Sequence, residues 1–171
     1  LARKFRASSS AVLWQGVPIP HRRGTALRGT EFSPLRIGRI CTPIARKWPD
    51  GLVDFYGQLS RNHPDIQWEF VGCPVSLQAR LMSACQGNAM FHAANWEART
   101  HLWNWDAMLY HHPDLTESFG RTVAEAARTG CIPIVDETGG FSEQLISLGL
   151  PGCRDWRSFS EAIDRLKDSR W

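Results

Sequence analysis

Short apolar segments alternate with longer amphipathic segments along most of the chain. The run from Cys131 to Val135 is typical, because it is short, apolar and β-branched at three positions, which predicts a buried parallel strand. Together, the strands are expected at Leu35–Cys41, Ile66–Val71, Ala89–His92, Trp105–Tyr110 and Cys131–Val135. The segment Pro151–Arg154 is expected to form a short sixth strand or a loop.

The segments between these strands carry apolar residues at helical spacing. Leu52, Phe55 and Leu59, for example, share one face of the first segment. Helices are expected at residues 50–62, 76–86, 96–104, 140–148 and 158–167, and from near Gly120 to a helix-ending glycine at Gly130. Strands that alternate with helices predict an α/β fold, a Rossmann-like parallel sheet with helices on both faces.

The stretch from Pro113 to Gly140 carries the strongest chemical signal. At its predicted helix start, Gly120 has no side chain and so lets another molecule approach closely. The first N–H groups of a helix lack intrahelical partners and sit at the positive end of the macrodipole, so a helix start attracts anions. Ser118, Phe119, Gly120 and Arg121 are expected to supply these N–H groups. The run Thr138–Gly140 predicts a second cradle of this kind.

Two carboxylates accompany the expected anion site. Glu117 lies just before the helix, so a phosphate bound at the helix start would place its attached group beside Glu117. Glu125 lies within the helix, and a carboxylate there suits a pair of neighbouring hydroxyls such as those of a ribose. Two glutamates on a solvated helix surface are the alternative interpretation. An anion site with two carboxylates describes a receptor for a sugar nucleotide.

The order of motifs in this stretch extends that interpretation. Glu-Ser-Phe-Gly begins at Glu117, Glu-Ala at Glu125, a glycine- and proline-containing strand at Gly130, and Gly-Gly-x-x-Glu at Gly139. This series resembles the C-terminal domain of GT-B glycosyltransferases, specifically the large retaining family 4, also called group 1. The resemblance covers the chain from about Pro34 onward. It implies a domain that binds a nucleotide-sugar donor for retaining transfer of a sugar to an acceptor.

The resemblance also implies roles for particular residues. Gly38 and Arg39 close the first strand, and Arg39 with Lys47 would hold the donor diphosphate, whose charge grows as the glycosidic bond breaks. The spacing to Lys47 is longer than in the family, so Arg46 is an open alternative for the second cation. A basic surface loop is the plainer interpretation of these charges. Glu117 would contact the donor sugar, and the catalytic set is Glu117, Arg39 and Lys47.

The remaining donor contacts follow the same scheme. Glu125 would hold the ribose, and Ala93–Trp96 would line the site of the base, as implied by the resemblance. Gly72 is expected at the carboxyl end of a strand, where open α/β sheets bind ligands. The donor-binding set is Glu125, Ser118, Phe119, Gly120, Gly38 and Gly72.

Length and charge bound the organisation of the chain. Its 171 residues suffice for one domain with a core. Residues 34–171 are expected to form the nucleotide-sugar-binding domain. Residues 1–33 are expected to be an interdomain linker or the end of an N-terminal domain. The net charge is +3, and the first 50 residues hold ten Lys and Arg against two Asp and Glu. This basic end lacks interleaved aromatic residues and any nucleic-acid motif, so an anionic small ligand or a membrane surface is the expected partner rather than nucleic acid.

No cofactor or metal is expected at the donor site. The chain has no Asp-x-Asp, GxGxxG or P-loop motif, and its five cysteines lack ligand spacing, which favours reduced thiols and no zinc. The adjacent His111 and His112 would point to opposite faces of a strand and so cannot chelate one metal, and His92 is expected to be structural. With no long apolar run, the expected location is cytoplasmic, with peripheral contact at the inner membrane face as an option.

Two other functions stay open at this point. A sugar-nucleotide 2-epimerase shares the two-domain architecture, and a non-catalytic GT-B-like binding module would keep only the fold. The Glu-Ser-Phe-Gly run argues against the epimerase, and the presence of Glu117, Glu125 and Arg39 argues against a module that has lost its site. A UDP- or GDP-sugar is the expected donor, and a sugar, lipid or protein acceptor would bind an N-terminal domain outside this chain, so the chain alone is expected to be inactive.

Overall fold

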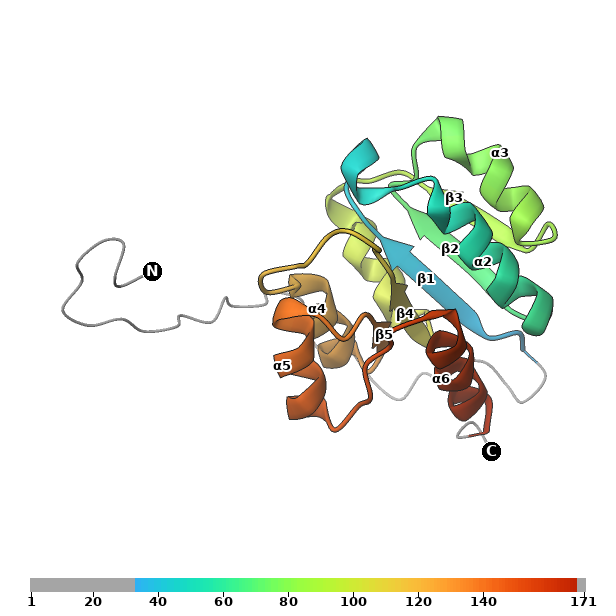
Figure 1. Cartoon of the computed structure of the whole chain (residues 1–171). Coiled ribbons are helices and arrows are strands. Elements are labelled where there is room, and N and C mark those ends of the chain that lie inside the picture. The colour runs from blue at the N-terminus through green and yellow to red at the C-terminus, as the bar shows by residue number, and fades with distance from the viewer. Residues whose placement is uncertain (1–32, 169–171) are drawn as a thin grey trace.

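The computed structural model describes residues 33–168, which form one parallel five-stranded sheet in the order β3-β2-β1-β4-β5 (Figure 1). The strands are β1 (Arg36–Ile40), β2 (Gln67–Val71), β3 (Ala89–His92), β4 (Ala107–Tyr110) and β5 (Ile132–Val135). The α/β Rossmann-like fold predicted from the alternating pattern is therefore confirmed. The linker expected at residues 1–33 falls almost wholly outside the described residues.

The helices connect these strands at the expected places. They are η1 (Ala45–Lys47), α2 (Gly51–Asn62), α3 (Val75–Ala84), η2 (Trp96–Trp103), α4 (Arg121–Thr129), α5 (Gly139–Leu148) and α6 (Trp156–Asp168). Two details differ from the prediction: η2 is a 3-10 helix, and η1 was not expected. Of the two alternatives for Pro151–Arg154, the structure has the loop, with a single bridge between Asp136 and Cys153. Within residues 33–168, no helix combines the length and the apolarity that crossing a membrane requires.

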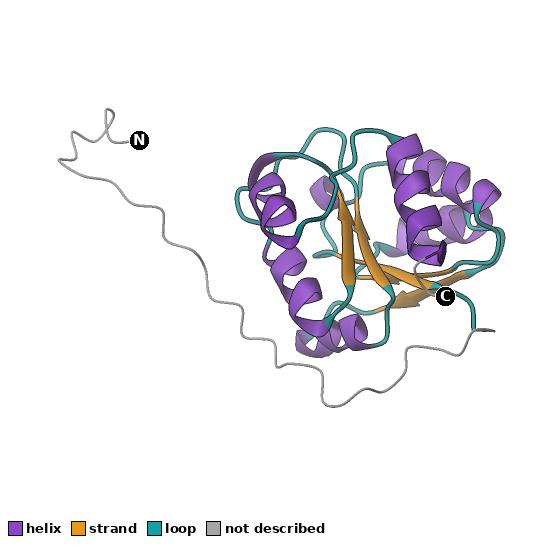
Figure 2. Ribbon diagram, turned by 90° about the horizontal axis from the view of Figure 1, so that it is seen from below, coloured by secondary structure: helices purple, strands orange, loops and turns teal. Residues whose placement is uncertain are grey.

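Helices cover both faces of the sheet (Figure 2). On one face α2 packs against α3 and α6, and Tyr56 of α2 makes edge-to-face contacts with the rings of Trp68 and Phe70 on β2. On the other face η2 and α4 pack together, and the indole of Trp105 lies over Gly38 of β1. A Cβ atom at position 38 would overlap that indole, which explains the glycine inside a strand.

The sheet order places a switch point between β1 and β4. The chain moves from β1 outward to β2 and β3, then returns to β4 on the other side of β1. Helices after β1 and after β4 therefore turn to opposite faces, which leaves a crevice at the carboxyl ends of these two strands. Ligands of open α/β sheets bind in such a crevice.

Candidate functional site

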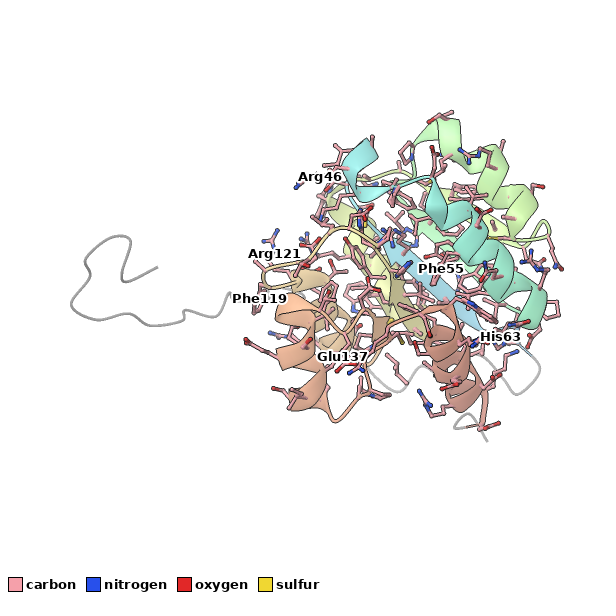
Figure 3. The ribbon with its side chains drawn as sticks, viewed as in Figure 1. Arg46, Phe55, His63, Phe119, Arg121 and Glu137 are labelled. Atoms are coloured by element: carbon pink, nitrogen blue, oxygen red, sulfur yellow. The ribbon has the colours of Figure 1, made fainter. Side chains whose placement is uncertain are left out.

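A cavity of about 500 Å³ occupies this switch point. Its floor comes from the ends of β1 and β4, including Ile40 and Tyr110, and its walls come from η1, η2 and the loop and first turns of α4. Figure 3 labels Phe119 and Arg121 on that loop and turn, and Arg46 on η1. All four residues predicted to surround the anion, Ser118 to Arg121, line the cavity.

The start of α4 has the geometry of an anion site. Gly120 is the N-cap residue, with a left-handed φ of 75°, and a Cβ atom there would overlap the ring of Phe141. Only glycine meets both demands without strain. The first hydrogen bond of the helix runs from Val123 N–H to the Gly120 carbonyl at 3.0 Å. The N–H groups of Arg121 and Thr122 come before it and have no acceptor within the helix. The positive end of the α4 dipole therefore points at the cavity.

Glu117 stands beside this helix start and is held from two sides. The Lys47 ammonium forms an ion pair with Glu117 Oε1, and Tyr110 donates its phenol proton to the same oxygen at 3.1 Å. Burial raises the pKa of Tyr110 to about 12, so the phenol stays protonated and remains a donor. Burial lowers the pKa of Lys47 from its ordinary value, and Arg46 and Arg39 act in the same direction. An anion in the cavity would favour the charged ammonium.

The loop that carries Glu117 is fixed by the start of α5. Gly140 N–H donates to the Glu117 carbonyl at 2.9 Å, and the Gln144 amide donates to the Phe119 carbonyl. A Cβ atom at Gly139 or Gly140 would overlap the Glu117–Ser118 backbone. The expected second anion cradle is thus corrected: the N–H of Gly140 is engaged by protein, and the two glycines hold the Glu117 loop in place.

The two predicted diphosphate cations are placed differently. Lys47 lines the cavity, whereas Arg39 is fully buried beneath it. The Arg39 guanidinium donates to the carbonyls of His111 and Lys47, each at 2.9 Å, and lies 5.0 Å from the Trp48 ring and 4.5 Å from the Tyr110 ring. This corrects the expected direct contact, because the side chain holds the loop that presents Lys47 and does not face the cavity.

His112 holds the same loop from the other side. Its Nδ1 accepts from the N–H groups of Asp114 and Leu115, at 3.2 and 2.9 Å, so Nε2 carries the proton and donates to the Arg46 carbonyl at 2.7 Å. The Arg46 side chain is exposed and lies outside the cavity lining. Of the two alternatives for the second cation, the structure therefore brings Lys47 to the site.

The glycines Gly38 and Gly72 also lie outside the lining. Gly38 makes room for Trp105, and Gly72, at φ 78°, lets the end of β2 approach the Cys41 carbonyl more closely than a side chain would permit. Cys41 and Val71, which lie beside Gly72, line the cavity instead. The structure shows a packing role for both glycines, and Gly72 follows the carboxyl end of β2 as expected; the donor contacts predicted for them stay a prediction.

Glu125 lies at the inner end of the cavity, on α4. It is 2% exposed, and its Oε1 lies 2.6 Å from Nε of Arg99 on η2. The cavity lining includes Arg99, together with Ala94 and Asn95 from the loop predicted to line the base site. Arg99 was missed by the sequence analysis, because nothing in the sequence pairs a residue of η2 with one of α4.

Comparison with known proteins adds to this picture. No protein-family model matches the sequence, and no curated protein sequence matches it. The structure resembles WaaG, a glycosyltransferase involved in lipopolysaccharide biosynthesis, with a TM-score of 0.65 at 14% identity over 80% of this chain. It also resembles the C-terminal domain of LpcC, a glycosyl transferase group 1 family protein from Francisella tularensis, with a TM-score of 0.63 at 15% identity over 84% of this chain. The fold is that of a GT-B C-terminal domain.

A third solved structure contains a nucleotide. A mutant of TarM from S. aureus, in complex with fondaparinux, alpha-GlcNAc-glycerol and UDP, has a TM-score of 0.65 at 12% identity over 85% of this chain. The chain covers 83% of the LpcC domain, but only 31% of TarM and 39% of WaaG. It therefore spans about a third of the length of TarM and WaaG.

Proposed function

We propose that this chain is the donor-binding domain of a retaining glycosyltransferase and binds a nucleoside-diphosphate sugar at the switch-point cavity. One observation carries the proposal: the start of α4 and two carboxylates, Glu117 and Glu125, line a single cavity, and each carboxylate is paired with a cation from another element. These are the groups that a diphosphate, a sugar and a ribose need. The fold shared with WaaG, LpcC and TarM supports the assignment.

The diphosphate would bind between Lys47 and the start of α4. There it meets an ammonium and the N–H groups of Arg121 and Thr122 at the positive end of the helix dipole. Lys47 would then exchange its ion pair with Glu117 for one with phosphate. This exchange stabilises the charge that develops on the leaving diphosphate, and it is the reason that a divalent metal is not required in this proposal.

Glu117, released from Lys47, would accept hydrogen bonds from hydroxyls of the donor sugar. Tyr110 keeps one carboxylate oxygen of Glu117 oriented by its hydrogen bond, and the second oxygen is available to accept from the sugar. Arg39 is a positioning residue here, because it reaches the chemistry through the Lys47 carbonyl. The leaving phosphate itself would take the acceptor proton on the same face, which gives retention of configuration.

The nucleoside would extend toward η2. Glu125 would accept from the two ribose hydroxyls, and the base would lie along Ala94 and Asn95. UDP in the TarM complex makes a uridine diphosphate sugar the first class to test, with the guanosine diphosphate sugar also expected from the sequence as the second. Acceptor recognition is assigned to a domain outside this chain, because the relatives TarM and WaaG are much longer.

Isothermal titration of the chain with UDP, GDP and the corresponding nucleosides tests the proposal. We expect the diphosphates to bind more tightly than the nucleosides, and binding to persist after addition of a chelator. A diphosphate that binds no better than its nucleoside, or binding that disappears with chelator and returns with Mn²⁺, would contradict it. Transfer with retention is tested on the longer enzyme by NMR of the product anomer, since the chain alone is expected to bind donor without turnover.

A further inference from the structure

A second group of ligating side chains lies beside the donor cavity. Glu69 of β2, His92 of β3 and His101 of η2 place three potential metal-binding atoms within 4.8 Å of one another. Glu69 Oε2 lies 3.1 Å from Nε2 of His92 and 3.6 Å from Nδ1 of His101. None of the three residues lines the cavity that holds Glu117 and Glu125.

The spacing of these atoms is close to that of a zinc site. With metal–ligand bonds of about 2.0–2.1 Å, two ligand atoms of a tetrahedral ion lie about 3.3 Å apart. The distances of 3.1 and 3.6 Å from Glu69 Oε2 fall on either side of that value. The imidazole centroids of His92 and His101 are 4.2 Å apart, and the third pair of ligand atoms lies within the same limit of 4.8 Å.

The burial of the cluster also suits an ion. The Glu69 side chain is fully buried, which fixes its carboxylate, whereas the His92 and His101 side chains are 25% and 27% exposed. This arrangement offers three protein ligands on one side and an opening to solvent on the other. Zinc sites with two histidines and one glutamate have the same donor set and keep a water as fourth ligand.

We propose that Glu69, His92 and His101 bind a divalent transition-metal ion, with Zn²⁺ the first to test. The ion would clamp η2 onto β2 and β3, since His101 lies on η2 and the other two ligands lie on the sheet. Arg99, two residues before His101, pairs with Glu125 in the donor cavity. The ion would therefore stabilise the wall of that cavity without contacting the donor, and the site stands whether or not the proposed function is correct.

A neighbouring cation, Arg36, opposes metal binding and provides a test with the opposite sign. Arg36 donates from Nε and Nη2 to Glu69 Oε1, at 2.9 and 2.5 Å, so it withdraws negative charge from the carboxylate. Removal of that cation leaves the full negative charge of the carboxylate for the metal ion. Arg36→Met should therefore bind the metal ion more tightly than wild type does. A cluster that is held only by hydrogen bonds would show no gain in metal affinity from this substitution. The Arg36 side chain is 41% exposed, so the substitution spares the core.

The experiment is a titration of tag-free, chelator-stripped chain with Zn²⁺ by calorimetry and with Co²⁺ by visible absorption. We expect one equivalent of each ion to bind, with a tetrahedral Co²⁺ spectrum that lacks a thiolate charge-transfer band. His92→Ala and His101→Ala should each weaken binding at least about tenfold. His63→Gln is the matched control, because its ring lies against Ser160, away from the cluster, and it should bind as wild type does.

Three results would overturn the site. They are no stoichiometric binding by wild type, binding that survives both histidine substitutions, or a cysteine-type Co²⁺ spectrum. The two histidine variants change partly exposed side chains, so circular dichroism should report a native fold for both. Glu69→Gln and Arg36→Met both break the buried pair between Arg36 and Glu69, so the two histidine variants decide the question should either of these fail to fold.

Discussion

Arg99 Nε lies 2.6 Å from Glu125 Oε1 and joins η2 to α4 across the inner end of the donor cavity. Lys47 and Glu117 form the corresponding pair at the outer end and join η1 to the α4 loop. Both carboxylates of the cavity are thus neutralised by protein cations. In the proposed complex, hydroxyls of the nucleotide sugar would take the place of the cations at the two carboxylates, and its phosphates would pair with Lys47.

Lys47→Met should weaken UDP binding by about tenfold or more and leave uridine binding nearly unchanged. A charged hydrogen bond contributes about 1.5–3 kcal/mol, and about 1.4 kcal/mol corresponds to a factor of ten in Kd. Methionine keeps the apolar stem of the lysine side chain but lacks the charged ammonium. Calorimetry with both ligands measures the difference.

Arg46→Met is the matched control for this prediction. Arg46 precedes Lys47 in η1, carries the same charge and is exposed outside the cavity lining. We expect it to bind UDP as wild type does at moderate salt. If Arg46→Met were the variant that loses diphosphate affinity, Arg46 would be the phosphate cation and the assignment of Lys47 would be wrong.

Gly120→Ala should destabilise the protein more than Gly149→Ala. Both glycines occupy left-handed caps, at φ 75° and 66°, so both substitutions carry the penalty of about 1–2 kcal/mol for that conformation. A Cβ at Gly120 also overlaps the Phe141 ring, whereas nothing lies within 4 Å of one at Gly149. Urea unfolding measures both variants. Equal losses would show that Phe141 yields freely and that the start of α4 does not depend on this contact.

Much of this architecture could be read from the sequence because it depends on local patterns. An apolar run predicts the strand at Cys131–Val135, and a glycine predicts the end of α4 at Gly130. Elements of this kind determine the order of the sheet and the position of Glu117 in the chain. The cavity follows from these elements, since parallel strands bring their carboxyl ends to one edge.

The direction of long side chains could not be read in this way. The same Gly-Arg pair at a strand end fits a cation that faces a ligand or one buried under a loop, and the structure shows that Arg39 is buried beneath Lys47. The pairing of Arg99 with Glu125 spans 26 residues and depends on how η2 packs on α4. The same holds for Glu69, His92 and His101, which no ligand spacing in the sequence connects.

Stability should fall as the pH decreases below neutrality, and His63 should account for part of the loss. Burial lowers the pKa of His63 from its ordinary value of 6.5, and Lys167 acts in the same direction, so the unfolded chain binds this proton more tightly than the folded one. The contribution is fully present above about pH 6.5 and is lost as the pH falls toward the folded pKa. Its slope is at most about 1.4 kcal/mol per pH unit.

His63→Gln should flatten this acid dependence, because glutamine does not titrate and can still reach Ser160, which lies 2.7 Å from the ring. Urea unfolding between about pH 7.5 and pH 5.5 measures the slope. A residual slope is expected from His101, whose pKa is also lowered by burial. An unchanged slope in His63→Gln would mean that His63 has the same proton affinity in the folded and unfolded states.

Glu125→Gln should weaken binding of a ribonucleoside diphosphate and spare its 2′,3′-dideoxy analogue. The carboxylate can accept from both ribose hydroxyls, and the loss of its charge should cost about tenfold or more in affinity. The analogue lacks those donors, so the change at Glu125 leaves its binding unaltered. The variant should fold, because the Arg99 side chain is 42% exposed. Water can therefore solvate the guanidinium that loses its charged partner.

Glu97→Gln is the matched control, since Glu97 lies on η2 near Arg99 but is exposed and outside the cavity lining. It removes one negative charge from the same region without touching the proposed ribose site. Calorimetry of both variants with both ligands therefore separates a specific contact from a general change of charge. An equal loss for ribo and dideoxy ligands in Glu125→Gln, or a loss in neither, would make the Arg99–Glu125 pair a structural link between η2 and α4 rather than a receptor for the ribose.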